Sequence, residues 1–397
     1  MIEDCSPAEI WWNSVAGPSE VVNEVNLVLL STHNVILRVP RDLPWRHEMR
    51  DAIRELVQRS SGISDLSVCV IDVKDDLEDR LTPEEVLMKR CGHNDDWKLY
   101  RPGAGSVCNY MLRKQVLLNK IVWIKGIPTF DEYKRWKSFC SKWKSPSIKD
   151  GLIVIESSWP DIHPEGTFRV VDYEAHVNYY SVQLFNGLIL DDEYFERSSY
   201  LQKRYVAAIA SHLCGMDVEV AEYLVRNYDL ITEDPIKSIQ GVSTSDIFIK
   251  RGNGDTEDHV LLLCRENKTA ELGKRIWEAQ LETLFPIIEQ ERLEIIASLR
   301  GELEELIGAN AIQQYNADVS NVEDIELGTM VYLMADIHDR GGSVLEMDSP
   351  DIRNRIRNLR ILRNNLAHHS VCSTEQVRWL LKDYDGAEAK RVSGESC

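Results

Sequence analysis

Short runs of β-branched and aliphatic residues, separated by polar segments, divide the first part of the chain. They predict five strands, at residues 34–39, 66–73, 120–124, 152–155 and 168–171. Between the first two strands Met49, Ile53 and Val57 recur at helical spacing, and a second helix is predicted at residues 129–144. Strands that alternate with helices form parallel sheets covered on both faces. The pattern therefore predicts a doubly wound α/β domain with a mostly parallel sheet over residues 1–190.

After residue 190 the apolar positions follow helical spacing. Residues 191–264 are predicted to form helices and a linker, with a glycine-containing loop at 250–258. Residues 265–385 are also predicted to be helical, and one apolar stripe consists of Trp277, Leu281, Leu284, Ile288, Ile295 and Leu299. Pro286 is predicted to kink this helix or to begin a new one. Further helices are predicted at residues 322–337, 350–366 and 374–381, which makes a four-helix bundle followed by a flexible tail at 386–397.

Composition narrows the class of protein. A chain of 397 residues, 43% hydrophobic and 28% charged, is typical of a globular protein with two or three domains. The 65 acidic and 46 basic side chains give a net charge of −19, which argues against a protein that coats nucleic acid along its whole surface. Any RNA site must therefore be local.

The cysteines and the apolar runs indicate the cellular compartment in which we expect the protein. Nine cysteines, none in a C-x-x-C pair, indicate neither a zinc ribbon nor a disulfide scaffold, and a reducing cytosol fits them best. The first residues lack a basic, apolar leader, and no apolar run is long enough for a membrane span. We therefore expect a cytoplasmic protein without membrane partners.

The order of strands and helices in residues 1–190 resembles that of the P-loop NTPase folds of AAA and STAND proteins, and residues 191–264 resemble their helical lid. The resemblance implies a glycine-rich phosphate loop after the first strand and an acid at the end of a later one. Here residues 40–45 (PRDLPW) contain two prolines, which remove N–H groups that would wrap phosphate. Lys125 follows the third strand, and Glu156 ends the fourth. We expect a degenerate scaffold with no bound cofactor; an ATP-driven switch dependent on Glu156 is an alternative.

Residues 133–144 interleave basic and aromatic side chains. That composition could bind single-stranded nucleic acid. However, Trp136, Phe139 and Trp143 are spaced three and four residues apart, which places them on one helical face. We expect these aromatic residues to pack on the sheet while the lysines stay in solvent. The turn at residues 103–105 is interpreted as a loop.

Positive charge concentrates on the helix predicted at residues 350–366. Residues 278–326 carry twelve acids and two arginines, whereas residues 351–372 carry five arginines and one acid. The predicted apolar face of this helix consists of Ile352, Ile356, Leu359 and Leu366. Arg363 falls in the middle of that face and needs an anionic partner. Either Arg363 forms a core salt bridge, for example to Glu326, or the face opens onto an interface between two bundles.

The same segment contains the hexad R-N-x-x-x-H, formed by Arg363, Asn364 and His368. In this position the motif resembles that of the HEPN superfamily, over roughly residues 270–385. The resemblance implies a metal-independent endoribonuclease site shared by two copies, in a prokaryotic defence, abortive-infection or toxin system. It implies that Arg363 stabilises phosphate charge, that His368 is the general acid or base toward the 2′-hydroxyl, and that Asn364 keeps the site polar.

Two alternatives compete with a ribonuclease. Arg363 and His368 can simply pair with acids or cap the end of a helix, in a non-catalytic adaptor of a larger defence complex. His368, His369 and Cys372 could be drawn as metal ligands, but they lack a fourth ligand, so we expect no metal. In the favoured hypothesis the partners are RNA, a second copy of the chain through the C-terminal bundle, and a protein that docks on the N-terminal domain.

Overall fold

The computed structural model describes residues 5–76, 81–92, 99–101, 106–159, 163–164, 166–191, 198–252, 258–309, 311–314, 317–335, 345 and 349–382. The turn at 103–105, the tail at 386–397 and parts of the predicted loop at 250–258 and helix at 322–337 lie outside them. The chain divides into two compact units. The first comprises Met1–Phe185 with Met216–Glu219, and the second comprises Asn186–Gly215 with Val220–Cys397.

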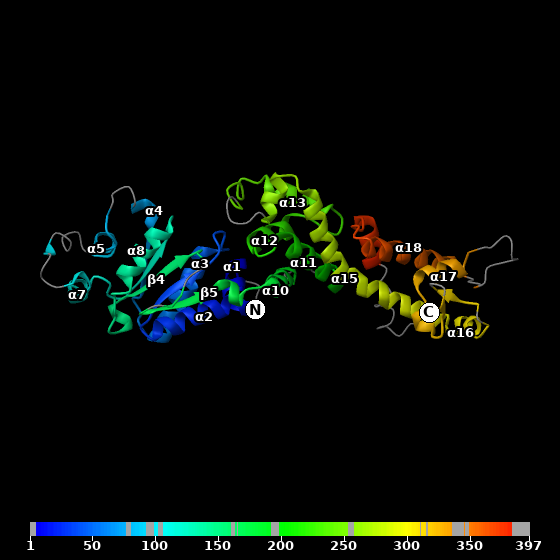
Figure 1. Cartoon of the computed structure of the whole chain (residues 1–397), viewed down its shortest axis with the longest axis horizontal. Coiled ribbons are helices and arrows are strands. Elements are labelled where there is room, and N and C mark those ends of the chain that lie inside the picture. Colours follow the sequence, from blue (N-terminus) through cyan, green and yellow to red (C-terminus); the bar gives the residue numbers. More distant parts are fainter. Residues whose placement is uncertain are drawn as a thin grey trace. The chain divides into compact units, whose positions relative to one another are not determined.

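A five-stranded parallel sheet forms the first unit (Figure 1). Its strands are β1 (Asn34–Arg38), β2 (Ser67–Asp72), β3 (Lys120–Lys125), β4 (Leu152–Ser157) and β5 (Phe168–Asp172). All five strands predicted from the sequence are confirmed. Their order across the sheet is β2-β3-β4-β1-β5, and every neighbouring pair is parallel. After β1 the chain runs to β2 at one edge of the sheet, and after β4 it runs to β5 at the opposite edge. Because these two connections run in opposite directions, the sheet has a topological switch point between β1 and β4.

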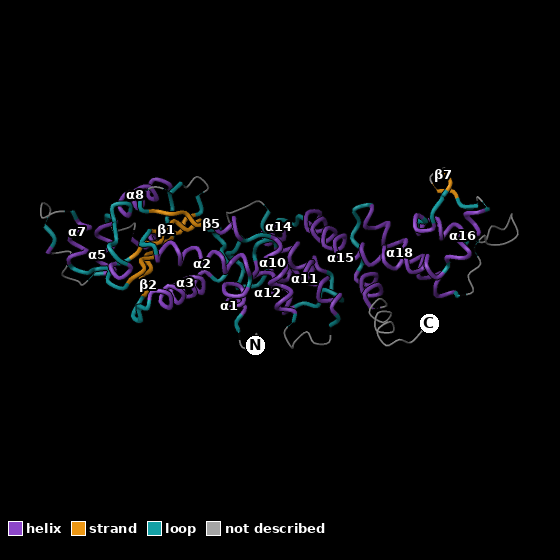
Figure 2. Tube along the Cα trace, turned by 90° about the horizontal axis from the view of Figure 1, so that it is seen from below, coloured by secondary structure: helices purple, strands orange, loops and turns teal. Residues whose placement is uncertain are grey.

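Helices cover both faces of this sheet. The helices and helical turns of this unit are α1 (Pro7–Glu9), the π-helix η1 (Ile10–Ser14), α2 (Ala16–Leu30), α3 (Arg46–Ser61), α4 (Val73–Asp76), α5 (Pro83–Cys91), α7 (Val107–Arg113), α8 (Phe130–Cys140), the 3₁₀ turn η2 (Ile148–Asp150), α9 (Tyr173–His176) and α10 (Tyr179–Leu190), whose last residues belong to the second unit. In Figure 2, α8 lies on one side of the strands and α2 and α3 lie on the other. The predicted α/β architecture is therefore confirmed.

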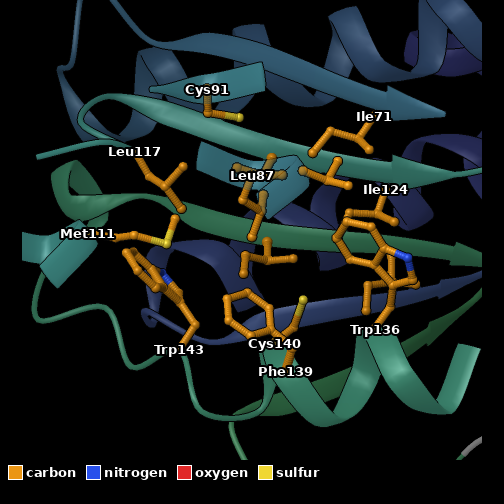
Figure 3. Close-up of a cluster of buried hydrophobic side chains, with 14 of the residues drawn as sticks. Ile71, Leu87, Cys91, Met111, Leu117, Ile124, Trp136, Phe139, Cys140 and Trp143 are labelled. Carbon is orange, nitrogen blue, oxygen red and sulfur yellow. The ribbon is translucent and has the colours of Figure 1, made fainter. Parts of the chain in front are cut away.

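The core on the α8 side is a continuous apolar cluster (Figure 3). Strand residues such as Ile124 and Ile155 pack there against Leu87 of α5 and against Trp136 and Phe139 of α8. Trp143, just beyond α8, is also buried. The aromatic residues of segment 133–144 therefore pack on the sheet as predicted.

The second unit is almost entirely helical. Its elements are α11 (Tyr200–Cys214), α12 (Val218–Asn227), whose first two residues belong to the first unit, α13 (Pro235–Ser243), α14 (Val260–Arg265), α15 (Thr269–Ser298), α16 (Arg300–Gly308), the short strands β6 (Gln313–Gln314) and β7 (Ala317–Asp318), the 3₁₀ turn η4 (Val322–Asp324), α17 (Leu327–Leu333), α18 (Pro350–Ala367) and a last helix at residues 374–382. Pro286 lies inside α15, which continues through it rather than ending there. Both α11 and α18 pack against α15, and α17 packs against α18.

One predicted helix differs from the structure. Apolar spacing predicts a helix over residues 322–337, but a 3₁₀ turn, extended backbone at Ile325 and Glu326, and then α17 occupy its first part. The guanidinium of Arg292 donates to the carbonyl oxygens of Glu323 (2.7 Å) and Ile325 (3.0 Å). These two bonds tie the segment before α17 to α15.

Among the described residues, no helix has the length and apolar character needed to cross a membrane.

Candidate functional site

The predicted catalytic residues lie at the C-terminal end of α18. This helix begins where the hydroxyl of Ser349 accepts a hydrogen bond from the N–H of Ile352, with Pro350 in the first turn. Its buried residues are Ile356, Leu359, Leu362 and Leu366. Arg363 falls between Ile356 and Leu359 around the helix, and because Leu362 also belongs to the buried face, Arg363 is off its centre. Its side chain is half-buried, as is that of Asn364.

Arg363 pairs with Glu326, the residue that precedes α17. Its Nη2 lies 3.6 Å from Oε2 of Glu326, and the two side chains are 33% and 34% exposed. Of the two predicted arrangements, the salt bridge to Glu326 is present, but it is not in the core. An ion pair with this exposure is screened by solvent and holds its partners weakly. Arg363 is therefore accessible to a competing anion such as a phosphate.

His368 ends the helix. Its backbone N–H donates to the carbonyl of Asn364 (3.0 Å), and its side chain is exposed. His369 adopts a left-handed conformation with φ of 56°, and the N–H of Ser370 then bonds to the carbonyl of Asn365 (2.8 Å). This turn ends α18 and directs the chain away from it. Arg363, Asn364 and His368 thus share one helix end, although no interaction among the described residues joins Arg363 to His368 within one copy.

Two residues of α15 hold this helix end in place. The indole N–H of Trp277 donates to the carbonyl of Leu366 (2.8 Å), and the ring of His369 packs edge-on against Trp277. Buried Gln280 accepts from the N–H of Cys372 (2.7 Å) and donates to the carbonyl of the same residue (3.1 Å). The sequence predicts Trp277 as part of an apolar stripe, but it did not lead to a role for Gln280. The amide side chain of Gln280, which lies between apolar positions of the same helix, was the signal that a buried hydrogen bond was needed there.

The surface of α18 is rich in arginine. Arg355 is tied to Glu291, whose Oε2 lies 2.6 Å from its Nε. Arg357 and Arg360 are exposed, and neither forms an ion pair with any residue that the structure describes. In a chain with a net charge of −19, this is a local concentration of positive charge on the helix that ends at His368. Exposed guanidinium groups of this kind suit the phosphates of a nucleic acid.

The metal-ligand alternative finds no support in this geometry. Cys372 is buried, with its Sγ 3.9 Å from the carbonyl oxygen of Leu362. Burial raises the pKa of the free Cys372 thiol to about 11. Within the described part of the chain, no three His, Cys, Asp or Glu side chains cluster closely enough to hold a metal ion.

A pocket that the sequence analysis missed lies in the first unit, at the carboxyl ends of the strands. It has a volume of about 460 Å³ and is lined by Val39, Pro40, Arg41, Arg46, Asp72, Lys74, Lys125, Gly126, Ile127, Pro128, Glu156, Ser157, Ser158 and Trp159. Most of these residues lie at or just after the ends of β1, β2, β3 and β4, so the pocket includes the switch point between β1 and β4. Open α/β sheets bind ligands at this place.

Ion pairs organise the wall of this pocket. Glu156 is 3% exposed and accepts hydrogen bonds from Arg46 and from the indole of Trp123. Arg46 also donates to the carbonyls of Pro40 (3.0 Å) and Arg41 (2.7 Å). The residues of the proline-containing loop are therefore held by an arginine side chain, where a phosphate loop would use its own backbone N–H groups. Glu156, the acid proposed for an ATP-driven switch, is already bound by two donors.

Asp72 and Lys125 pair across the ends of β2 and β3. Burial works to raise the pKa of Asp72, but the hydrogen bond and charge of Lys125 outweigh it and hold that pKa below its ordinary value. Gly126 has φ of 71°, and a Cβ at this position would collide with the Asp72 carboxylate. Four basic side chains and two acids line the pocket, so its chemistry favours an anionic ligand.

No model of a known protein family matches this sequence, and no curated protein matches it significantly.

Proposed function

We propose that the protein is a metal-independent endoribonuclease of a prokaryotic defence or toxin-type system. One observation carries the proposal: exposed His368 and displaceable Arg363 share one end of an arginine-rich helix in an otherwise acidic chain. RNA would bind along the exposed arginines of α18, where phosphate contacts supply most of the affinity. The fold around the site contributes Trp277 and Gln280, which fix the end of the helix.

The chemistry follows from the residue types. The 2′-oxygen of a ribose attacks the adjacent phosphorus, and the bond from phosphorus to the 5′-oxygen breaks, giving a 2′,3′-cyclic phosphate and a 5′-hydroxyl. An imidazole takes the proton from the 2′-hydroxyl, and a second imidazole gives a proton to the 5′-oxygen. Arg363, freed from Glu326, stabilises the charge on the phosphorane oxygens. Asn364 keeps the site polar, and DNA is spared because it lacks the 2′-hydroxyl.

The need for both an acid and a base supports a dimer. A single His368 cannot accept one proton and donate another in the same step, whereas two copies supply two imidazoles. Arg363 and His368 are also not joined within one copy by any interaction among the described residues. A homodimer through the C-terminal helices, as in a HEPN-like bundle, would bring Arg363 of one copy toward His368 of the other.

A second candidate function is a non-catalytic adaptor of a defence complex. The Arg363–Glu326 pair favours it, because this pair ties α18 to the start of α17 and so gives Arg363 a structural task. In that case Arg363→Ala changes folding or assembly and His368→Ala does little.

In either function the first unit senses or docks a partner. The cationic pocket at the carboxyl ends of its strands supports this role, since it offers a place for an anionic group without a phosphate loop. Glu156 is held by Arg46 and Trp123, which argues for a structural role rather than for positioning magnesium.

The test is incubation of the purified full chain with mixed cellular RNA in EDTA, with fragment ends analysed for 2′,3′-cyclic phosphate. Loss of a general acid or base is expected to slow cleavage by about 10²- to 10⁴-fold in His368→Ala, and Arg363→Ala is expected to lose at least as much. His47→Ala is the matched control, because His47 is 76% exposed and lies in the other unit. Absence of cleavage by a dimeric wild type, with His368→Ala unchanged in assembly and Arg363→Ala impaired, would favour the adaptor.

A further inference from the structure

Two cysteines that are 22 positions apart in the sequence meet in the first unit. Cys69 lies on β2, an edge strand of the sheet, and Cys91 is the last residue of α5. Their sulfur atoms are 2.7 Å apart. A disulfide bond is about 2.05 Å long, so roughly 0.6 Å of further approach would form one. Neither thiol takes part in the proposed ribonuclease site, so the contact calls for an explanation of its own.

The surroundings of the two thiols differ. Cys91 is buried and belongs to the apolar cluster of Figure 3, together with Leu87 of the same helix. Cys69 packs at the border of that cluster and is half-buried, because β2 lies at the edge of the sheet. A reagent from solution can therefore reach Cys69 first, while Cys91 is shielded behind it.

The electrostatics give the same order. The hydrogen bond from the Cys91 thiol, followed by the charges of Lys120 and Arg90, lowers the pKa of Cys69 despite its partial burial. The same hydrogen bond, together with burial, raises the pKa of Cys91 well above its ordinary value. Thiolates are the reactive form of cysteine, so Cys69 is the nucleophile and Cys91 is the resolving thiol.

We propose that Cys69 and Cys91 form a peroxide-sensitive dithiol that closes to a disulfide and clamps α5 onto edge strand β2. The Cys69 thiolate attacks one oxygen of hydrogen peroxide, the O–O bond breaks, and after protonation a water leaves with Cys69 as a sulfenic acid. The sulfur of Cys91 then attacks the sulfur of Cys69, and the S–O bond breaks. A second water carries away the hydroxyl with the thiol proton. One peroxide is reduced to two waters as two thiols are oxidised to one disulfide.

The disulfide would join two elements that otherwise meet through packing. It would close a chain segment that contains α5, and cross-links of this kind limit the unfolded state. The proposal concerns modification of the first unit and does not depend on the ribonuclease reaction.

Mass spectrometry of the full-length protein tests the proposal. The reduced wild type is treated with equimolar hydrogen peroxide, and free thiols are then alkylated. A peptide pair joined through Cys69 and Cys91, about 2 Da lighter than the sum of its thiol forms, is expected, and dithiothreitol should reverse it. Exposed Cys5 is the internal control and should be oxidised about tenfold more slowly, because thiolate character governs the rate.

Two variants separate the roles of the thiols. In Cys91→Ser, Cys69 should stop at a sulfenic acid that dimedone traps; in Cys69→Ser, Cys91 should remain a thiol. The oxidised wild type should melt several degrees above its reduced form, and neither variant should show this rise. Wild-type Cys69 and Cys91 that stay alkylatable while Cys5 reacts, or a Cys69 sulfenic acid that never joins Cys91, would overturn the proposal. A disulfide without a change in melting would overturn the clamp.

Discussion

The molecule contains two arginine–carboxylate pairs beside its two candidate sites, and they differ in burial. At the carboxyl edge of the sheet, Arg46 binds a Glu156 that is only 3% exposed and that also accepts from Trp123. At the end of α18, Arg363 lies 3.6 Å from a Glu326 that is 34% exposed. The carboxylate of Glu156 has almost no access to water, whereas the carboxylate of Glu326 is accessible to water and to dissolved ions.

The difference in carboxylate exposure distinguishes an ion pair with a structural role from one that a ligand can replace. Removing one partner of a buried pair leaves a charge without solvation, which costs far more than the pair itself contributes. An exposed pair contributes little, and either partner can be taken by a ligand. We therefore assign Arg46 and Glu156 to the support of the pocket wall, and Arg363 to a site that a phosphate can occupy.

The largest effect on stability is expected from Glu156→Ala. The substitution leaves the indole of Trp123 without its acceptor and removes the carboxylate that lies 3.8 Å from the guanidinium of Arg50, which is only 11% exposed. The free energy of unfolding of the first unit should therefore fall by about 3–5 kcal/mol. Equilibrium denaturation checks this value. Glu48→Ala, an exposed glutamate of α3, is the control and should change it by less than about 0.5 kcal/mol. A Glu156→Ala protein as stable as the control would show that the two pairs are equivalent.

An intermediate effect is expected from Gln280→Ala, which acts on the helix end rather than on an ion pair. The backbone N–H of buried Cys372 loses its acceptor, so unfolding should become easier by about 1–3 kcal/mol. RNA cleavage should fall as well, since the turn that carries His368 is no longer held. Gln290→Ala, an exposed glutamine of the same helix, should change neither quantity. Full RNA cleavage by a destabilised Gln280→Ala protein would show that the turn held by Gln280 is not needed for the activity of the site.

The sequence predicted local structure well where one periodicity governs a segment. All five strands follow from apolar runs, and α18 follows from Pro350 at its start together with the apolar positions along it. The helix predicted at residues 322–337 is interrupted by extended backbone at Ile325 and Glu326, where Arg292, about 30 positions earlier, binds the neighbouring carbonyls. Local spacing contains no information about a side chain from another element.

The same limit applies to the sites. The salt bridge of Arg363 to Glu326 could be suggested from sequence, since a guanidinium near an apolar face needs an anion. The pocket at the strand ends could not, because it depends on the order of the strands in the sheet. The contact of Cys69 with Cys91 was equally hidden: neither residue belongs to a motif, and only the packing of α5 on β2 brings them together.

The smallest effect on stability, and the sharpest test of the comparison, is expected from Glu326→Gln. Glutamine keeps the size of the side chain and removes only its charge. Because the pair is exposed, the free energy of unfolding should change by less than about 1 kcal/mol. Arg363 loses its competing anion at the same time, so RNA should bind about two- to fivefold more tightly, as that energy allows.

The same RNA-binding measurement is repeated at increasing ionic strength. The gain in RNA affinity of Glu326→Gln over wild type should shrink as ionic strength rises, because screening already weakens the exposed pair. Arg363→Ala is the matched comparison and should abolish the gain when it is combined with Glu326→Gln. If Glu326→Gln instead destabilised the protein as strongly as Glu156→Ala and left RNA binding unchanged, Arg363 would have the same structural role as Arg46, and the adaptor would be the better account of the C-terminal helices.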